Sequence, residues 1–123
     1  MGEKKTVYIG GAITGVPKYW EDFERVADQL TSWGYMVLTP STLPQGMDKA
    51  QYMRICFAMI DSADAVLFLP NWLHSGGATL EQTYCHYIGK PNYGIHSHEG
   101  VPSEVWAAWL KHDVEALLGE EVK

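Results

Sequence analysis

The sequence is poor in cysteine and in basic residues. Its two cysteines, Cys56 and Cys85, lack the spacing of a metal-ligand set and lie in apolar, helix-like stretches, so we expect buried, reduced thiols. Nine Lys and Arg stand against 15 Asp and Glu, a formal net charge of −6 at pH 7. This balance argues against general affinity for nucleic acid or anionic membranes. A small phosphorylated ligand needs only a local site and is not excluded.

Long apolar runs are also absent. None approaches the ~20 residues that a membrane-spanning helix needs. The first five residues lead into a strand-like stretch without a signal region, so we expect a cytoplasmic protein. With 123 residues, 46% of them hydrophobic, the chain fits one globular domain covering residues 1–123 and is not disordered.

Strand-like and helix-like segments alternate along the chain. β-Branched and apolar runs occupy 6–9, 35–38, 65–69 and 91–95, and helical periodicity covers 22–33, 49–61, 78–88 and 103–118. We predict one three-layer α/β domain with a flavodoxin-like or Rossmann-like parallel sheet of four to five strands, in the order 2-1-3-4, and helices on both faces. In the helix over 49–61, Asp48 is the expected N-cap, and Ile55 and Cys56 are expected to point inward.

Open α/β sheets bind ligands beyond the carboxyl ends of their strands, where the strand order reverses. The loop after the first strand holds Gly10, Gly11 and Gly15, whose backbone amides can face an anion. It matches neither a dinucleotide-binding fingerprint nor a P-loop. A tight turn without a ligand therefore stays open as the alternative.

The loop after the third strand is the second candidate. Ser75, Gly76 and Gly77 come just before a helix N-terminus, which favours an anion such as phosphate. Glu81, about one turn into that helix, can reach back to the strand ends, although a surface role beside the helix dipole is also open. Trp72 can stack on a nucleobase or pack on a neighbouring subunit.

Four segments together resemble the nucleoside 2-deoxyribosyltransferase superfamily over residues 7 to 95. They are Val7-Tyr8-Ile9-Gly10-Gly11-Ala12-Ile13, Asp64-Ala65-Val66, Ser75-Gly76-Gly77-Ala78-x-x-Glu81 and Gly89-Lys90-Pro91. The likeness is greatest to the DUF4406 branch, which is common in bacteriophages. The chain is also similar to the deoxynucleoside 5′-monophosphate N-glycosidases.

This resemblance implies a reaction. A glutamate at the position of Glu81 attacks the anomeric carbon of a 2′-deoxynucleoside, and the deoxyribosyl ester passes to another base or to water. A carboxylate suits the oxocarbenium character of glycosidic cleavage. Tyr8 would orient Glu81, although a core aromatic is an equal alternative, and Ser75 would bind the 5′-phosphate. The implied substrate-binding residues are Gly10, Gly11, Ile13, Thr14, Gly15, Trp72, Ser75, Gly76 and Gly77.

The sequence departs from the superfamily at one position. An aspartate about eight residues before Asp64 supports the departing base or the sugar in these enzymes, and Cys56 stands there in this chain. A thiol cannot replace that carboxyl group without a strongly altered pKa. Either another group, such as His74, protonates the base, or the protein binds a nucleotide derivative as a non-catalytic sensor.

Partners and cofactors follow from the same reasoning. His96 and His98 lack further ligands at a recognisable spacing, so we predict no metal, and the reaction needs no organic cofactor. The expected partner is a small nucleoside or nucleotide, not nucleic acid or membrane. Relatives assemble as dimers or larger rings, and five tryptophans agree with a homo-oligomer.

Overall fold

Four short parallel strands form the centre of the fold in the computed structural model, which describes residues 4–122. They are β1 (Thr6–Gly10), β2 (Met36–Leu38), β3 (Ala65–Phe68) and β4 (Asn92–Gly94). Their order is β2-β1-β3-β4, and every neighbouring pair is parallel. The predicted strand order is confirmed, and the order reverses between β1 and β3.

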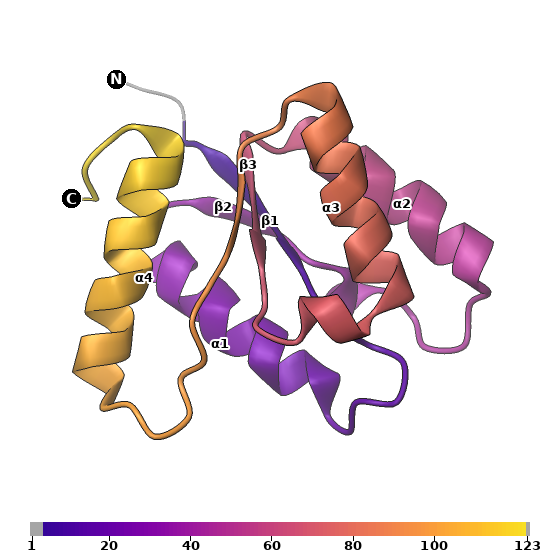
Figure 1. The fold of residues 1–123 in the computed structure, drawn as a ribbon, viewed down its shortest axis with the longest axis horizontal. Helices are drawn as coiled ribbons and strands as arrows, with labels where there is room; N and C mark the ends of the chain where they lie inside the picture. The colour runs from indigo at the N-terminus through magenta and orange to yellow at the C-terminus, as the bar shows by residue number, and fades with distance from the viewer. Residues whose placement is uncertain (1–3, 123) are drawn as a thin grey trace.

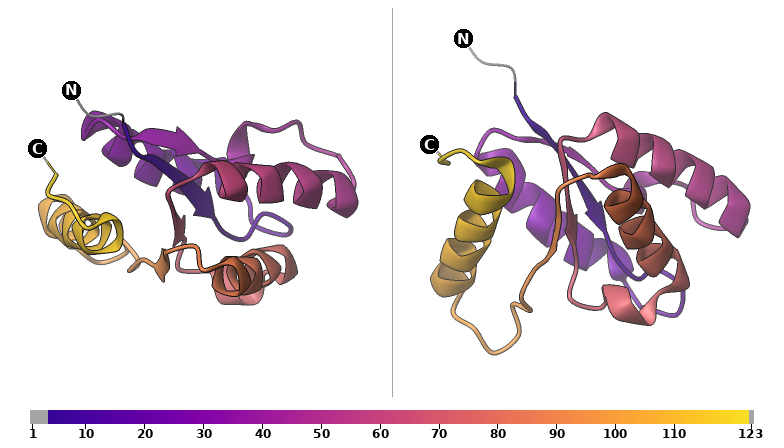
Figure 2. Two further views of the ribbon diagram at one scale, coloured as in Figure 1. Left: turned by 90° about the horizontal axis from the view of Figure 1, so that it is seen from above. Right: turned by 45° about the horizontal axis from the view of Figure 1, so that its top comes forward.

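Helices cover both faces of the sheet, as predicted. They are α1 (Tyr19–Ser32), α2 (Lys49–Ser62), α3 (Gly76–Ile88) and α4 (Ser103–Leu118), with short 3-10 helices η1 (Pro40–Thr42) and η2 (Trp72–His74). α1 and α4 lie on one side of the sheet, whereas α2 and α3 lie on the other (Figure 1). The additional views in Figure 2 show α2 and α3 side by side. Among residues 4–122, no helix combines the length and apolarity needed to cross a membrane.

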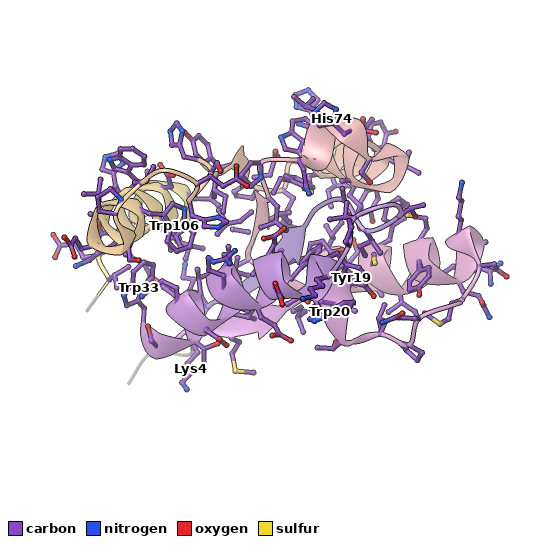
Figure 3. The ribbon with its side chains drawn as sticks, turned by 90° about the horizontal axis from the view of Figure 1, so that it is seen from below. Lys4, Tyr19, Trp20, Trp33, His74 and Trp106 are labelled. Carbon is purple, nitrogen blue, oxygen red and sulfur yellow. The ribbon has the colours of Figure 1, made fainter. Side chains whose placement is uncertain are left out.

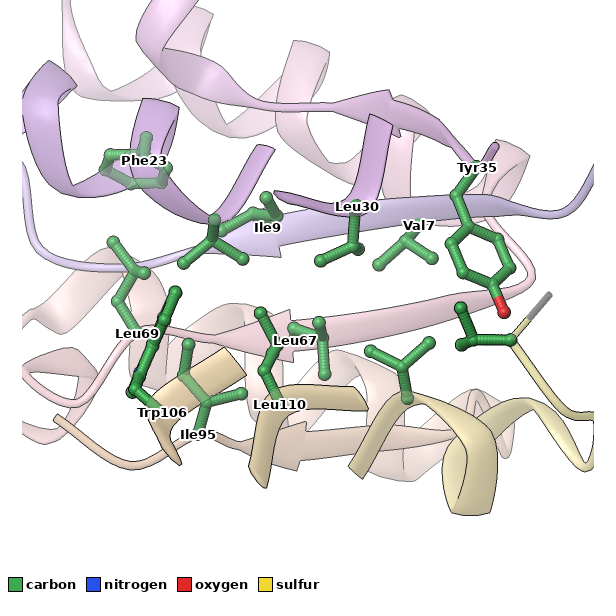
Figure 4. Packing of buried hydrophobic residues seen from close by; sticks show 13 residues of the cluster. Val7, Ile9, Phe23, Leu30, Tyr35, Leu67, Leu69, Ile95, Trp106 and Leu110 are labelled. Atoms are coloured by element: carbon green, nitrogen blue, oxygen red, sulfur yellow. The ribbon is translucent and has the colours of Figure 1, made fainter. Parts of the chain in front are cut away.

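The alternation of side chains along β1 decides which residues face which helices. Val7 and Ile9 belong to the core packed against α1 and α4, which Figure 4 shows from close by. Tyr8 points to the opposite face and packs with residues of α2 and α3. Successive side chains of a strand point to opposite faces, so Tyr8 and Gly10 share the face that α2 and α3 cover.

Capping residues set the helix starts. The Asp48 side chain accepts from the Gln51 amide, and the Gln51 side chain accepts from the Asp48 amide, which forms a capping box at α2. The Ser75 hydroxyl accepts from the Ala78 amide at 3.1 Å, so α3 begins two residues before the predicted start. Gly89 ends α3 with a φ of 73°.

One position that was predicted to point inward does not do so. The prediction for Ile55 is wrong, because this residue is 37% exposed. Cys56 and Ile60 form the buried face of α2, and Ile55 lies about 100° around the helix from Cys56. Trp106 is a core residue between α4 and α1 (Figure 3), whereas Trp109, three positions later, is 44% exposed.

Candidate functional site

Glu81 lies on the buried face of α3 and points toward the sheet. Its side chain is 4% exposed, and Tyr8 on β1 is fully buried. The Tyr8 hydroxyl donates a hydrogen bond to Oε2 of Glu81 at 2.7 Å. The buried positions Ala78, Glu81 and Cys85 are three and four residues apart, so a carboxylate occupies a position on the apolar stripe of the helix. Glu81 is therefore not an exposed residue that merely complements the helix dipole.

Cys56 joins this pair from α2. Its side chain is 4% exposed, and its thiol interacts with both the Tyr8 hydroxyl and the Glu81 carboxylate. Three elements that are distant in the sequence thus bring a phenol, a carboxylate and a thiol into one buried group. Cys56 occupies the position at which the resemblance implies an aspartate. In the structure, this position lies in the same buried group as Glu81, the predicted nucleophile.

The surroundings alter the acidity of all three groups. Burial raises the pKa of Glu81 from its ordinary 4.5 to about 7, although the hydrogen bonds from Tyr8 and Cys56 lower it. Burial also raises the pKa of Cys56 from 9.0 to about 11 and that of Tyr8 well above 10.0. At neutral pH, Tyr8 and Cys56 keep their protons, whereas Glu81 divides between its acid and carboxylate forms. In its carboxylate form, Glu81 thus accepts a hydrogen bond from the neutral Tyr8 hydroxyl, and the neutral Cys56 thiol lies in the same buried group.

Gly10 leaves room for this carboxylate. A Cβ atom on Gly10 would lie 3.1 Å from Oε1 of Glu81 and 2.8 Å from Cε1 of Phe68. A Cβ atom on Gly11 would lie 2.8 Å from Cδ1 of Leu69. Both glycines are buried, so each has a packing reason for its small size. Phe68 was not predicted as part of the site, because an aromatic residue in an unbroken apolar strand looks like ordinary core.

The remainder of the first glycine loop is more open. Thr14 and Gly15 are exposed, Ile13 is half-buried, and Gly15 has a φ of 78°. The loop is tied to the β3 side of the fold because the Ala12 amide donates to Oδ1 of Asn71 at 3.2 Å. Asn71 was not predicted either; its signal in the sequence is a polar side chain directly after a buried strand. This bond joins the two loops that meet where the strand order reverses.

The loop after β3 presents its predicted residues in different ways. Trp72 is half-buried, and its ring packs on Phe68 with ring centroids 5.5 Å apart. Its Nε1 lies 3.0 Å from the position that a Cβ atom on Gly94 would take, so this glycine makes room for the indole. His74 is exposed and points away from the body of the protein (Figure 3). Trp72 thus packs on Phe68, whose ring lies beside Gly10, whereas His74 is not part of the buried group.

The start of α3 remains accessible. Gly76 and Gly77 are exposed, and Ser75 is half-buried with its hydroxyl accepting from the Ala78 amide. The first amides of a helix have no intrahelical acceptor, so they can bind an anion there. Glu81 lies four residues beyond Gly77, which places these amides about one helical turn from the carboxylate.

Two cavities lie on the other side of the sheet. They are bounded by α1, by the segment around residues 95–101 and by Trp106, and Arg25 and His98 line both. None of the predicted site residues lines either one. His96 and His98 lie in this region, where their rings contact Trp109 and Trp106 at centroid distances of 5.5 Å and 6.3 Å. Within residues 4–122, no cluster of three or more His, Cys, Asp or Glu side chains is arranged to hold a metal ion.

Comparison with known families identifies a match over most of the chain. A family model described as "Domain of unknown function (DUF4406)" matches residues 5–92. The matched segment includes β1 to β3, α1 to α3 and the start of β4, and it contains Tyr8, Cys56, Glu81 and both candidate loops. A comparison with curated proteins finds no significant match.

Proposed function

This chain belongs to the DUF4406 family, and we propose that it cleaves or transfers the N-glycosidic bond of a 2′-deoxyribonucleoside or its 5′-monophosphate. Glu81 is the nucleophile and Tyr8 is its orienting partner. The observation that carries the proposal is the buried 2.7 Å hydrogen bond between them, on the face of the sheet that α2 and α3 cover. A carboxylate enclosed in this way costs stability, because burial opposes its ionised form, and buried groups with a shifted pKa cluster at functional sites.

The geometry suits attack by one carboxylate oxygen. Tyr8 holds Oε2, and Oε1 is the oxygen nearest Gly10 at the end of β1. In the proposed reaction, Oε1 forms a bond to C1′ as the bond from C1′ to the base nitrogen breaks. The base leaves with the bonding electron pair and takes a proton from solvent water. Water or a second base then attacks C1′ and loses a proton to solvent, and the bond from C1′ to Oε1 breaks, which releases the Glu81 carboxylate.

The phosphate of a nucleotide would bind at the start of α3. The Gly76 and Gly77 amides and the Ser75 hydroxyl supply donors there, and Thr14 and Gly15 face solvent in the neighbouring loop. These features favour a 5′-monophosphate over an unphosphorylated nucleoside. The sugar would then lie between this anion site and Glu81, and Trp72, at the same edge, would contact the base.

The proposal extends to the superfamily, the location and the assembly of the protein. We propose that the chain belongs to the nucleoside 2-deoxyribosyltransferase superfamily, in a branch common in bacteriophages. In this proposal, the protein is a cytoplasmic homo-oligomer that acts on a small nucleotide. Neither a metal nor an organic cofactor enters the proposed steps, because a carboxylate and backbone dipoles supply the charges that they need.

One observation favours a second function. The thiol of Cys56 has a pKa of about 11, so at neutral pH it is a far weaker proton donor to a departing base than the aspartate that the resemblance implies at this position. A protein that keeps the binding loops but lacks this acid could bind a nucleotide derivative without cleaving it. The alternative is therefore a non-catalytic nucleotide sensor with the same fold.

Base release separates the two functions. Wild-type protein is incubated with a panel of deoxynucleosides and their 5′-monophosphates, and free base is followed by chromatography. The panel is repeated with Glu81→Gln and with Glu104→Gln, a control at an exposed position of α4. Release by the wild type and by the control, but not by Glu81→Gln, supports the enzyme. Binding by all three proteins without release supports the sensor.

A further inference from the structure

A substrate can reach Glu81 only if part of its surroundings moves, because Glu81 is 4% exposed and Tyr8 is fully buried. α2 follows β2 and α3 follows β3, and all strands of the sheet are parallel, so the N-terminal ends of both helices lie at its carboxyl edge, where ligands of this fold bind. A path from this edge to Glu81 would enter at the seam between the first turns of α2 and α3.

Met53 lies across this seam. Its sulfur is 3.7 Å from the position that a Cβ atom on Gly77 would take, and the Ser75 hydroxyl oxygen is 3.9 Å from the same point. Met53 is half-buried on the first half of α2, and Gly77 is the second residue of α3. The Met53 thioether therefore lies beside the start of α3, within van der Waals reach of a side chain at position 77.

The buried group lies one layer below. Cys56 follows Met53 by three residues on α2, and Glu81 follows Gly77 by four residues on α3. Each step is about one helical turn, or roughly 5.4 Å along the axis. The pair Met53–Gly77 thus lies between the carboxyl edge and the pair Cys56–Glu81.

We propose that Met53 is the gating residue of this site, closing the passage between α2 and α3 and admitting a nucleotide to Glu81 when its side chain rotates. An unbranched side chain with three rotatable bonds suits this role, because it fills a gap and moves aside without a change in the backbone. The identity of the molecule that passes rests on the proposed function, whereas the closing of the path by Met53 does not.

The test measures the accessibility of Glu81 without using catalysis. Each protein is treated at mildly acidic pH with a water-soluble carbodiimide and glycinamide, which label protonated carboxyl groups, and labelling is followed by peptide mapping. Met53→Ala opens the seam, and Met53→Leu keeps its bulk. Met59→Ala is the matched control, because Met59 is half-buried on the same helix and packs on the core around Cys56. Exposed Glu99 serves as the internal standard.

We expect Met53→Ala to label Glu81 roughly tenfold faster than the wild type, equivalent to about 1.4 kcal/mol less for opening. Met53→Leu and Met59→Ala should label at the wild-type rate. An unchanged rate in Met53→Ala, or an equal rise in Met59→Ala, would overturn the gate, because the second result indicates general loosening. Faster labelling without turnover of any deoxynucleotide would retain the gate and contradict the proposed enzyme.

Discussion

Tyr8 and Glu81 are 73 positions apart in the sequence, yet the Tyr8 hydroxyl donates to the Glu81 carboxylate at 2.7 Å inside the protein. The bond connects the middle of β1 with the buried stripe of α3. Cys56 of α2 completes the group, so the two helices on one face of the sheet and the strand beneath them all contribute. The proposed chemistry depends on this arrangement.

Replacing Glu81 by Gln should change how stability depends on pH. The pKa of Glu81 is about 7 in the folded protein and 4.5 ordinarily, so the folded state binds more protons between these values. Wild-type stability therefore falls as the pH rises from about 4.5 to about 7 and then levels off, a loss on the order of 3 kcal/mol. Glu81→Gln should lack this loss in urea unfolding at a series of pH values. Parallel curves for the two proteins would show that Glu81 has no raised pKa.

Removing the Tyr8 hydroxyl should lower the activity that depends on Glu81. A hydrogen bond to a charged group contributes about 1.5–3 kcal/mol, so Tyr8→Phe should lower kcat/KM by roughly 10- to 100-fold. The Tyr8 bond lowers the pKa of Glu81, so its loss should also move the acid limb of the pH–rate profile to higher pH. Tyr87→Phe, at a residue that is 88% exposed, is the control. A lower rate without a shift of the profile would assign Tyr8 a packing role only.

Adding a methyl group at Gly10 should disturb the core and the site together. The new Cβ atom would lie 2.8 Å from the Phe68 ring, so Gly10→Ala should cost roughly 1–3 kcal/mol of stability. Gly76→Ala is the comparison, because nothing lies within 4 Å of a Cβ atom there and Ala is the better helix former. Thermal unfolding should show a lower Tm only for Gly10→Ala. Equal Tm values would mean that the end of β1 has space that the structure does not show.

Removing the Ser75 hydroxyl should weaken the binding of a nucleotide more than the binding of the matching nucleoside. Ser75 caps α3, so Ser75→Ala should cost about 1 kcal/mol of stability, and it should raise KM for a 5′-monophosphate more than for the matching nucleoside. Asp48→Ala is a matched control, because it removes the cap of α2 at a residue outside the proposed phosphate site. Steady-state kinetics on both substrates would decide. Equal effects of Ser75→Ala on the two substrates would argue against phosphate binding at this helix end.

Much of the fold could be predicted from local patterns. The unbroken apolar run at β3, the periodic helices and their capping residues led to the correct layers and strand order, because each reflects a local preference or a short-range pattern. Ile55 was placed wrongly because several apolar residues on α2 compete for one buried face, and only packing against the sheet decides among them.

The candidate site was predictable only in part. The positions of Tyr8, Cys56 and Glu81 were identified by resemblance, but their mutual contact depends on the register of β1 with α2 and α3, which no short segment encodes. Phe68 and Asn71 were missed for the same reason: one looks like core and the other like loop until the strands are assembled. The burial of Gly10 was equally hidden, because a glycine gives the same signal for a ligand loop and for close packing.

The central claim, a covalent bond between Glu81 and the sugar, can be tested by trapping the ester. Wild-type protein is mixed with a deoxynucleoside 5′-monophosphate that it cleaves, quenched in acid and analysed by peptide mass spectrometry. The account predicts a deoxyribosyl phosphate adduct on the peptide containing Glu81, formed together with free base and missing in Glu81→Gln. Free base released at the same rate by Glu81→Gln, or an adduct on another residue, would contradict it.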